Sequence, residues 1–243
     1  MKAKPTTSPT NTSGAPLHEL AYEEIRRALI SGRFSPGDKM TSRGLAAALG
    51  TSDMPVRAAL GRLVAEGGLV QRANGTIAVP LLSEENFEEV MTLRSMLEGR
   101  ATFLATTRLT AADLALLKRA AAELASAIKE NDIVAYLDAN HRFKFGIYER
   151  CNSPVLFSII EKLWLQAGPF LRNLDHRNLH GAMSYEYHKA ALKALEARDP
   201  LLASKAISAD IEHGLAQIRK TADFPGDAEL LPVTRLKALK EPQ

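Results

Sequence analysis

The sequence contains a single cysteine, Cys151, among its 243 residues. One cysteine cannot form an intrachain disulfide, and it cannot by itself build a cysteine-only metal site. Disulfide-rich secreted domains and zinc ribbons are therefore excluded as protein classes. The simplest compartment for such a chain is a reducing cytoplasm, and we expect the protein to be cytoplasmic.

Long apolar runs are also missing. No stretch approaches the roughly 20 apolar residues that a membrane-spanning helix needs, and no secretory signal pattern is found. The composition, with 46% apolar and 24% charged residues, is ordinary for a soluble globular protein, and the length suits two domains. We expect a soluble protein that does not bind membranes.

A large net charge and the common enzyme motifs are absent as well. The formal net charge is +3, and residues 17–80 hold eight Lys or Arg against six Asp or Glu. So small a basic excess argues against a protein that coats DNA regardless of its sequence. We find no nucleophile elbow, phosphate-binding loop or His-Glu-x-x-His motif. We therefore expect no catalytic residues and no cofactor.

The clearest pattern that is present lies in residues 40–80. Residues 42–49 are predicted to form a helix that ends at Gly50, a residue that accepts positive φ. A second helix is predicted to follow Ser52, which can cap it, and Pro55 is tolerated in its first turn. Two short helices separated by a tight turn are typical of a helix-turn-helix.

The second helix, which is predicted to reach about Glu66, has two distinct faces. Its apolar face would pack inward and consists of Val56, Ala59, Leu60, Leu63 and Val64. Its outward face is made of Met54 and the small residues Pro55, Ala58 and Gly61. Arg57 lies at the edge of the outward face, where a recognition helix places side chains that contact bases and phosphates.

Residues 69–79 are predicted to form a hairpin. Two short strand-like runs flank Asn74-Gly75, the dipeptide with the strongest preference for a two-residue hairpin turn. Arg72 lies beside that turn, as expected of a basic wing. Each arginine alone could be an ordinary surface charge, but helix, turn, helix and basic hairpin in this order favour DNA binding.

The segment SRGLAAALGTSDMPVRAALGRLVAEGGLVQRANGTIAV, which begins at Ser42, resembles the winged helix-turn-helix of the GntR family of bacterial transcription regulators. The family pattern is roughly S-x-R-x-L-A-x-x-L-G-x-S-x-x-P-V-R-x-A-L-x-x-L-x-x-x-G-L-V, and Thr41 takes its first serine position. The resemblance places Arg43, Ser52, Pro55 and Arg57 at DNA-contact or helix-start positions of the family, and Asn74-Gly75 at the tip of the wing. The predicted DNA-contacting residues are Arg43, Ser52, Asp53, Met54, Pro55, Arg57, Arg72, Asn74 and Gly75.

Asp53 departs from the family pattern, in which arginine is common at this position. An acidic side chain would repel phosphate there. It could instead accept a hydrogen bond from a cytosine amino group or orient Arg57.

The rest of the chain differs in character. Residues 1–16 are rich in Ser, Thr and Pro and are predicted to be a disordered tail. Residues 17–31 are predicted to form a helix, which the resemblance makes the support helix of the family. We expect Arg26, Arg27 and Arg33 to be solvated charges, with contact to flanking phosphates as the alternative. Six amphipathic helices are predicted to begin near residues 83, 110, 132, 153, 181 and 199. The predicted fold is therefore mainly α, with a winged helix-turn-helix at 17–80, an antiparallel helical bundle at 81–222 and an extension at 223–243.

The helical region resembles the FCD ligand-sensing domain of the FadR-type branch of GntR regulators. The resemblance covers about residues 83–220 and is looser than the first. The matching residues are Val90, Arg94, Glu98, Phe143, Lys144, Tyr148, Ser153, Pro154, Leu156, Tyr187, His188 and Leu192.

Several polar side chains fall on helix faces that otherwise point into the bundle. Charges there are costly unless they are paired. A core ion pair such as Arg94–Glu98 is one interpretation, and a polar pocket formed from several helices is the other. The predicted effector-binding residues of that pocket are Arg94, Asn140, Lys144, His188 and Asp210.

FCD domains often hold a divalent metal through a carboxylate or Asn and three histidines. The resemblance places these ligands at Asn140, Lys144, His188 and Asp210, of which only His188 is a histidine. A lysine ammonium has no lone pair and repels a cation. We therefore expect no tightly bound metal.

The sequence thus predicts a ligand-responsive bacterial DNA-binding regulator, a homodimer that represses a catabolic operon and is released from a double-stranded operator by a small carboxylate. Two alternatives for the pocket stay open. Lys144 pairs with Asp210 and leaves no room for a ligand, or a larger apolar effector binds among Trp164, Phe170 and Leu171. The alternative function is an enzyme or a metal-dependent binding protein that uses the polar pocket.

Overall fold

The computed structural model describes residues 16–171, 179, 183, 185–222 and 224. Apart from Pro16 and Phe224, the predicted N-terminal tail and C-terminal extension lie outside the described residues, as does the predicted start of a helix near residue 181. The described residues form nine helices and one two-stranded sheet, so the predicted mainly α fold is confirmed. Within the described part of the chain, no helix is long and apolar enough to cross a membrane.

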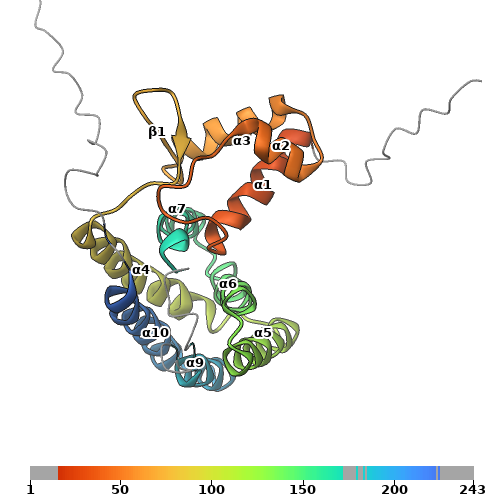
Figure 1. Ribbon diagram of the computed structural model, residues 1–243. Coiled ribbons are helices and arrows are strands. Elements are labelled where there is room, and N and C mark those ends of the chain that lie inside the picture. Colours follow the sequence, from red (N-terminus) through yellow and green to blue (C-terminus); the bar gives the residue numbers. More distant parts are fainter. Residues whose placement is uncertain (1–15, 172–178, 180–182, 184, 223, 225–243) are drawn as a thin grey trace, which may run out of the picture.

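The N-terminal part, residues 17–80, is called the head here. Its elements are α1 (Leu17–Ile30), α2 (Ser42–Leu49), α3 (Asp53–Ala65), β1 (Val70–Gln71) and β2 (Ile77–Ala78) (Figure 1). Thr41 caps α2 by accepting from the Gly44 amide, and Gly50 ends this helix with φ of 63°. Ser52 precedes α3 as predicted, although its side chain makes no capping hydrogen bond.

The hairpin turns through three residues, so the predicted two-residue turn is wrong. The Arg72 amide donates to the Thr76 carbonyl oxygen at 2.8 Å, which leaves Ala73, Asn74 and Gly75 as the connection. Gly75 has φ of 81°, the left-handed conformation that closes a three-residue hairpin loop. The Asn74 side chain accepts from the Thr76 amide at 3.0 Å and so stabilises the longer loop.

Six further helices form a bundle. They are α4 (Glu84–Ala105), α5 (Ala111–Glu130), α6 (Ile133–Tyr148), α7 (Pro154–Leu171), α9 (Glu186–Glu196) and α10 (Pro200–Thr221). A capping box of Thr110 and Asp113 starts α5 near the predicted residue 110, and Asp199 caps α10 ahead of Pro200, near the predicted residue 199. α4 packs on α10, and α5 packs on α6 (Figure 1). Local sequence signals therefore set most helix starts in the bundle.

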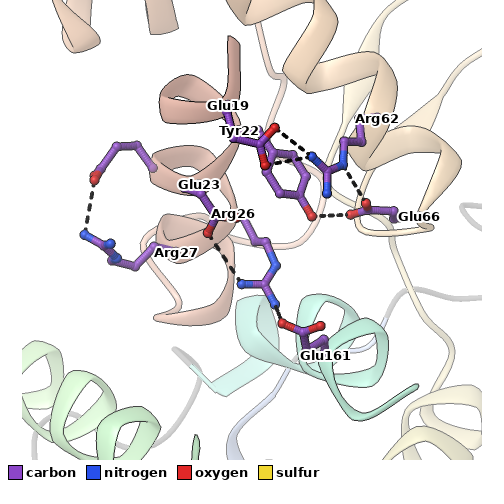
Figure 2. A network of polar contacts seen from close by, with 9 residues as sticks. Glu19, Tyr22, Glu23, Arg26, Arg27, Arg62, Glu66 and Glu161 are labelled. Atoms are coloured by element: carbon purple, nitrogen blue, oxygen red, sulfur yellow. Dashed lines mark hydrogen bonds and ion pairs between the residues drawn. The ribbon is translucent and has the colours of Figure 1, made fainter. Parts of the chain in front are cut away.

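α7 lies between the bundle and the head and packs against both α4 and α1 (Figure 1). Gly168 permits a close approach, because a Cβ atom added there would lie 2.5 Å from the carbonyl oxygen of Leu29 on α1. Arg26 of α1 donates to Glu161 of α7, and its side chain is only 14% exposed (Figure 2). The prediction that Arg26 is a solvated charge is therefore wrong. The hydrophobic core runs without a break from α1 to α10, and the division of the chain at residues 80 and 81 stays a prediction.

Candidate DNA interface and candidate effector site

α3 has the two faces that the sequence pattern predicts. Four of its apolar side chains are buried, namely Val56, Ala59, Leu60 and Leu63. On the other side Met54 is 80% exposed, and Ala58 and Gly61 are also exposed. The helix therefore presents a shallow surface of small residues to solvent, which a flat or grooved partner can approach closely.

A groove of about 670 Å³ lies between the start of α2, the face of α3 and the wing. Arg43 lines it from α2 and Arg57 lines it from α3, while Gly75 and Thr76 line it from the hairpin. Two arginines from different helices thus face one concave surface. Such a surface suits a negatively charged polymer, because it offers donors on one wall and backbone on the other.

Asp53 and Arg57 form an ion pair one helical turn apart on α3. The Arg57 Nε atom lies 2.5 Å from Asp53 Oδ2. A hydrogen bond from Ser42 lowers the pKa of Asp53 most, burial opposes this, and Arg57 lowers the pKa further. Asp53 is therefore ionised at neutral pH and holds the Arg57 guanidinium in place. Of the roles considered for Asp53, orientation of Arg57 is the one that this geometry supports.

The two wing residues differ in accessibility. The Arg72 side chain folds back onto the head, where its guanidinium donates to the Gly37 carbonyl oxygen at 3.5 Å. Asn74 is exposed at the tip of the loop. In the free protein the wing therefore offers its tip, and Arg72 would have to leave Gly37 before it could reach phosphate.

A polar network fixes α3 on α1 (Figure 2). The Arg62 guanidinium lies 3.6 Å from the centre of the Tyr22 ring and donates to Glu19 and Glu66. The Tyr22 hydroxyl donates to Glu66 at 2.7 Å, and burial, together with the Glu66 carboxylate, raises the pKa of Tyr22. α3 is thereby held on α1, which itself packs on α7.

A second polar cluster lies inside the bundle and brings all five predicted effector residues together. Arg94 and Lys144 supply positive charge, and all five side chains are buried. Three further buried residues that are not among the predicted site residues join them. The complete cluster consists of Arg94 and Glu98 on α4, Asn140, Lys144 and Tyr148 on α6, Trp164 on α7, His188 on α9 and Asp210 on α10.

Glu98 is the centre of one half of this cluster. Its Oε1 atom accepts from Arg94 Nε at 2.8 Å and from Trp164 Nε1 at 2.9 Å. Its Oε2 atom accepts from the Tyr148 hydroxyl at 2.5 Å. Burial raises the pKa of Tyr148, and the Glu98 charge raises it further. Three donors satisfy this carboxylate, so the predicted Arg94–Glu98 core pair is present within a larger network.

Asp210 is the centre of the other half. Lys144 Nζ lies 2.7 Å from Asp210 Oδ2, and His188 Nδ1 lies 3.4 Å from Asp210 Oδ1. His188 Nε2 is 2.9 Å from the Asn140 side-chain oxygen. Lys144 Nζ also lies 4.0 Å from Glu98 Oε2 and so links the two halves.

Protonation in this half is set by burial and by the neighbouring charges. Burial lowers the pKa of His188 more than Asp210 raises it, so the imidazole is neutral at neutral pH. Burial favours a raised pKa for Asp210, but its neighbours outweigh this and lower it. With His188 neutral, the charges that lower the pKa of Asp210 are those of Lys144 and, to a smaller extent, Arg94. Among the described residues, His188 Nδ1 and Asp210 Oδ1 have no hydrogen-bond partner.

A cavity of about 20 Å³ adjoins the cluster, and Arg94, Asn140, Lys144 and Asp210 line it. This volume holds roughly one water molecule. The donor set does not fit a metal ion, because Lys144 directs a cation toward Asp210 at the point where a ligand would be needed. In the described parts of the chain, no three His, Cys, Asp or Glu side chains are placed to hold a metal.

Tyr148 has a sequence signal that identifies it as part of the cluster. It follows Lys144 by four residues and therefore lies on the same inward face of α6. Trp164 has no such signal, because its indole reaches Glu98 across 66 positions of sequence. Its role depends on how α7 packs against α4.

Comparisons with known proteins agree with both halves of this structure. Residues 17–79 match the family described as bacterial regulatory proteins, gntR family, and residues 89–213 match the FCD domain. The HTH-type transcriptional regulator McbR of Escherichia coli strain K12 is 33% identical over 179 residues, which are 72% of this chain and 80% of McbR. A probable D-xylose utilization operon transcriptional repressor of Paenarthrobacter nicotinovorans is 28% identical over 83% of this chain and 87% of its own length.

The solved structures lead to the same family. E. coli McbR/YncC is similar with a TM-score of 0.78 and 28% identity, over 85% of this chain and 98% of that one. The match therefore extends over the head and the bundle together. The chain belongs to the GntR family of bacterial transcription regulators, in the branch whose DNA-binding domain is followed by an FCD domain.

Proposed function

We propose that this regulator binds a short, near-palindromic operator as a homodimer and represses a catabolic operon until a small carboxylate effector binds in the bundle. The observation that carries the DNA part is the groove that Arg43 and Arg57 share between α2, α3 and the wing. The proposed contacts to double-stranded DNA are Arg43, Ser52, Asp53, Met54, Pro55, Arg57, Arg72, Asn74 and Gly75.

Each part of the groove has a distinct role in this proposal. Arg57, held by Asp53, reads a base edge or a well-placed phosphate from the start of α3. Arg43 contacts the phosphate backbone, and the exposed wing tip at Asn74 and Gly75 enters the adjoining minor groove. The similar proteins described above are transcription regulators rather than enzymes, which fits a role in binding and not in catalysis.

Selection of genomic fragments by the purified protein tests the DNA part. Fragments from the source genome are incubated with the protein, and the retained ones are footprinted at a stated salt concentration. A protected site of one or two helical turns with twofold symmetry is expected. Protection that spreads evenly along every fragment, or no retained fragment at all, would contradict the proposal.

The effector part rests on the charges of the buried cluster. Arg94 and Lys144 balance Glu98 and Asp210 when His188 is neutral. The cavity beside them holds about one water, so a carboxylate can enter only if the cluster rearranges. We propose that Lys144 then moves from Asp210 to the effector carboxylate, as a cation that stands where FCD relatives hold a metal.

This exchange of partners leaves Asp210 without its cation. His188 Nδ1 lies 3.4 Å away and both facing atoms lack a hydrogen-bond partner among the described residues, so the imidazole can take up a proton and donate to Asp210. Binding of one anion is then accompanied by uptake of one proton. The affinity for the effector should accordingly rise as the pH falls from the pKa of His188 in the complex to its lower pKa in the free protein.

α7 provides a physical connection from the cluster to the head. Its Trp164 donates to Glu98, and one turn later Gly168 touches the backbone of Leu29 on α1. Arg26 of α1 pairs with Glu161 at the preceding turn of α7. A small shift of α7 that follows rearrangement around Glu98 would therefore move α1, and with it the recognition helix that α1 supports.

Calorimetry with a panel of small organic acids tests the effector part. Titrations in two buffers with different ionisation enthalpies at one pH give the number of protons taken up, and about one per bound acid is expected. Removal of the charged hydrogen bond in Lys144→Met should weaken binding by about 1.5–3 kcal/mol. No binding by the folded wild-type protein would favour the alternative that Lys144 and Asp210 fill the pocket. Equal binding by both proteins would remove Lys144 from the site.

A further inference from the structure

The cavity beside the effector cluster has two chemically different ends. On α6 its lining includes Leu137, Asn140 and Lys144, which follow one another by about one helical turn each. On α4, Arg94 follows Met91 by a similar step. On both helices the apolar residue comes first and the cation follows. The described residues that line the apolar end are Met91, Leu137, Leu171, Met183, Ile211 and Gly214.

The direction of α10 places Gly214 at the apolar end. Arg219, in the last turn of α10, donates to Glu84 at the start of α4 at 2.7 Å. Arg198, just before α10, donates to the carbonyl oxygen of Thr106, just after α4, at 2.9 Å. α10 therefore runs antiparallel to α4. Gly214 follows the aspartate of the cluster by one turn, so it lies toward the start of α4, where the apolar lining residues are.

Gly214 leaves unfilled space at this end. The residue is buried, yet a Cβ atom added to it would meet no atom within 4 Å. Met91 and Met183, which line the same end, have unbranched side chains that repack around a guest more easily than branched ones do. The apolar end can therefore widen by side-chain movement from the present cavity of about 20 Å³.

The charged end has one cation that is free to change partners. The Arg94 guanidinium donates to Glu98 through Nε at 2.8 Å and lies 4.2 Å from the centre of the Trp164 ring, so it is held on two sides. Lys144 lies 2.7 Å from Asp210 and carries its charge on a flexible stem. One ligand carboxylate can therefore take the Lys144 ammonium. A second carboxylate would lie unpaired beside Glu98 and Asp210, which repel it.

We infer that the effector of this site is a monocarboxylate with a short apolar tail, and that the space at Gly214 sets this specificity. The inference rests on the proposed function, in which the effector carboxylate binds Lys144. The tail then extends past Asn140 to Leu137 and Gly214. Tyr136 adds one hydroxyl to the lining, and it is uncharged because burial and the charge of Asp210 raise its pKa. A hydroxyl or a second charge on the tail would be buried against apolar side chains.

Calorimetry of the full chain at pH 7 with five acids tests the ligand class. The acids are acetate, butanoate, 3-methylbutanoate, 3-hydroxybutanoate and succinate. Each buried methylene should tighten binding about fourfold, so butanoate should bind about tenfold or more tightly than acetate. 3-Hydroxybutanoate has a hydroxyl in place of one methyl group of 3-methylbutanoate and should bind about tenfold or more weakly than that acid. Succinate should be weaker than butanoate by at least about tenfold, because its second charge is unpaired.

Substitution of Gly214 tests where the tail lies. Gly214→Leu fills the open space and should bind 3-methylbutanoate about tenfold or more weakly, with its affinity for acetate unchanged. Gly214→Ala adds a single methyl group and should show a smaller loss of the same kind, which keeps the test valid if the leucine variant does not fold. Ala216→Leu is the matched control, because Ala216 is exposed on the same helix, and both affinities should stay as in the wild type. Circular dichroism of each variant reports its folding.

The possible failures are distinguishable. Wild-type protein that binds 3-hydroxybutanoate or succinate as tightly as the matched apolar acid, or butanoate no more tightly than acetate, would overturn the inference and leave the proposed carboxylate effector in place. A preference for apolar acids that both Gly214 variants retain unchanged would overturn the placement of the tail. No binding of any of the five acids by the folded wild type would overturn the inference together with the effector part of the proposed function.

Discussion

Replacement of Lys144 by methionine should destabilise the folded chain strongly and in a pH-dependent way. Methionine keeps most of the apolar stem but removes the ammonium that lies 2.7 Å from Asp210. Asp210 is almost completely buried, so its charge is left in a medium of low polarity without its main cation. The loss of one partner from such a buried pair costs about 3–5 kcal/mol in free energy of unfolding.

The destabilisation caused by Lys144→Met should depend on pH. In the wild type the Lys144 charge helps to keep the pKa of His188 low, whereas Asp210 raises it. Lys144→Met removes the lowering charge, so His188 binds a proton more readily in the folded variant than in the folded wild type. A group whose pKa is raised in the folded state stabilises the fold at low pH. This stabilisation is lost as the pH rises through the folded-state pKa. The variant should therefore be closer to the wild type at pH 6 than at pH 8.

Urea denaturation at one fixed protein concentration measures these differences, because unfolding of a dimer depends on concentration. Asp210→Asn and the double variant Lys144→Met/Asp210→Asn complete a double-mutant cycle. The double variant should be more stable than the sum of the two single effects by about 0.5–3 kcal/mol, since it leaves no buried charge unpaired. Additive effects, or a cost below about 1 kcal/mol for Lys144→Met at pH 8, would refute the account of this pair.

Three further predictions concern the link to the head, the acid sensitivity and the metal positions. Gly168→Ala should lower the free energy of unfolding, measured by urea denaturation, by about 1–3 kcal/mol, because the new methyl group forces α1 away from α7. The control Gly214→Ala, whose new methyl group meets no atom within 4 Å, should raise it by about 0.5–1 kcal/mol. Burial, with Arg26 nearby, lowers the pKa of His141 from 6.5 to about 4. The free energy of unfolding should therefore fall as the pH drops from 6.5 to 4. His141→Phe should make this fall smaller, as measured by urea midpoints over a series of pH values. Lys144→His with Asp210→His should gain stoichiometric zinc or nickel in metal analysis, and such metal in the untagged wild type would contradict our view of this site.

Local sequence signals predicted the starts of most helices. Thr110 with Asp113 starts α5, and Asp199 with Pro200 starts α10, because each cap involves residues only a few positions apart. The apolar face of α3 also follows from spacing alone. Such signals are reliable where the stabilising contact lies within one helical turn.

Contacts between distant segments were not predictable in the same way. The burial of Arg26 depends on Glu161, 135 positions later, and the role of Trp164 depends on how α7 packs against Glu98. The loop at Asn74 has three residues because a side chain competes with the backbone for the Thr76 amide. The preference of the Asn-Gly dipeptide for a two-residue turn takes no account of this side-chain hydrogen bond.

The effector cluster lies between these two cases. Polar residues on inward helix faces indicated which side chains would be buried, and the structure brings Arg94, Asn140, Lys144, His188 and Asp210 together as predicted. Periodicity does not say which charge pairs with which. The Lys144–Asp210 pair and the small cavity follow from the packing of α6 and α10 on α4, and whether an effector binds there stays a prediction.

The central claim is that α3 reads operator DNA through Arg57. Fluorescence anisotropy with a labelled operator fragment, at fixed salt, gives the dissociation constant for wild type, Arg57→Ala and the control Arg119→Ala, in which an exposed arginine of α5 is removed. Arg57→Ala should lose about 1–3 kcal/mol, which is about 5- to 150-fold in Kd, and the control should bind as the wild type does. A folded Arg57→Ala protein with unchanged operator affinity would contradict the claim.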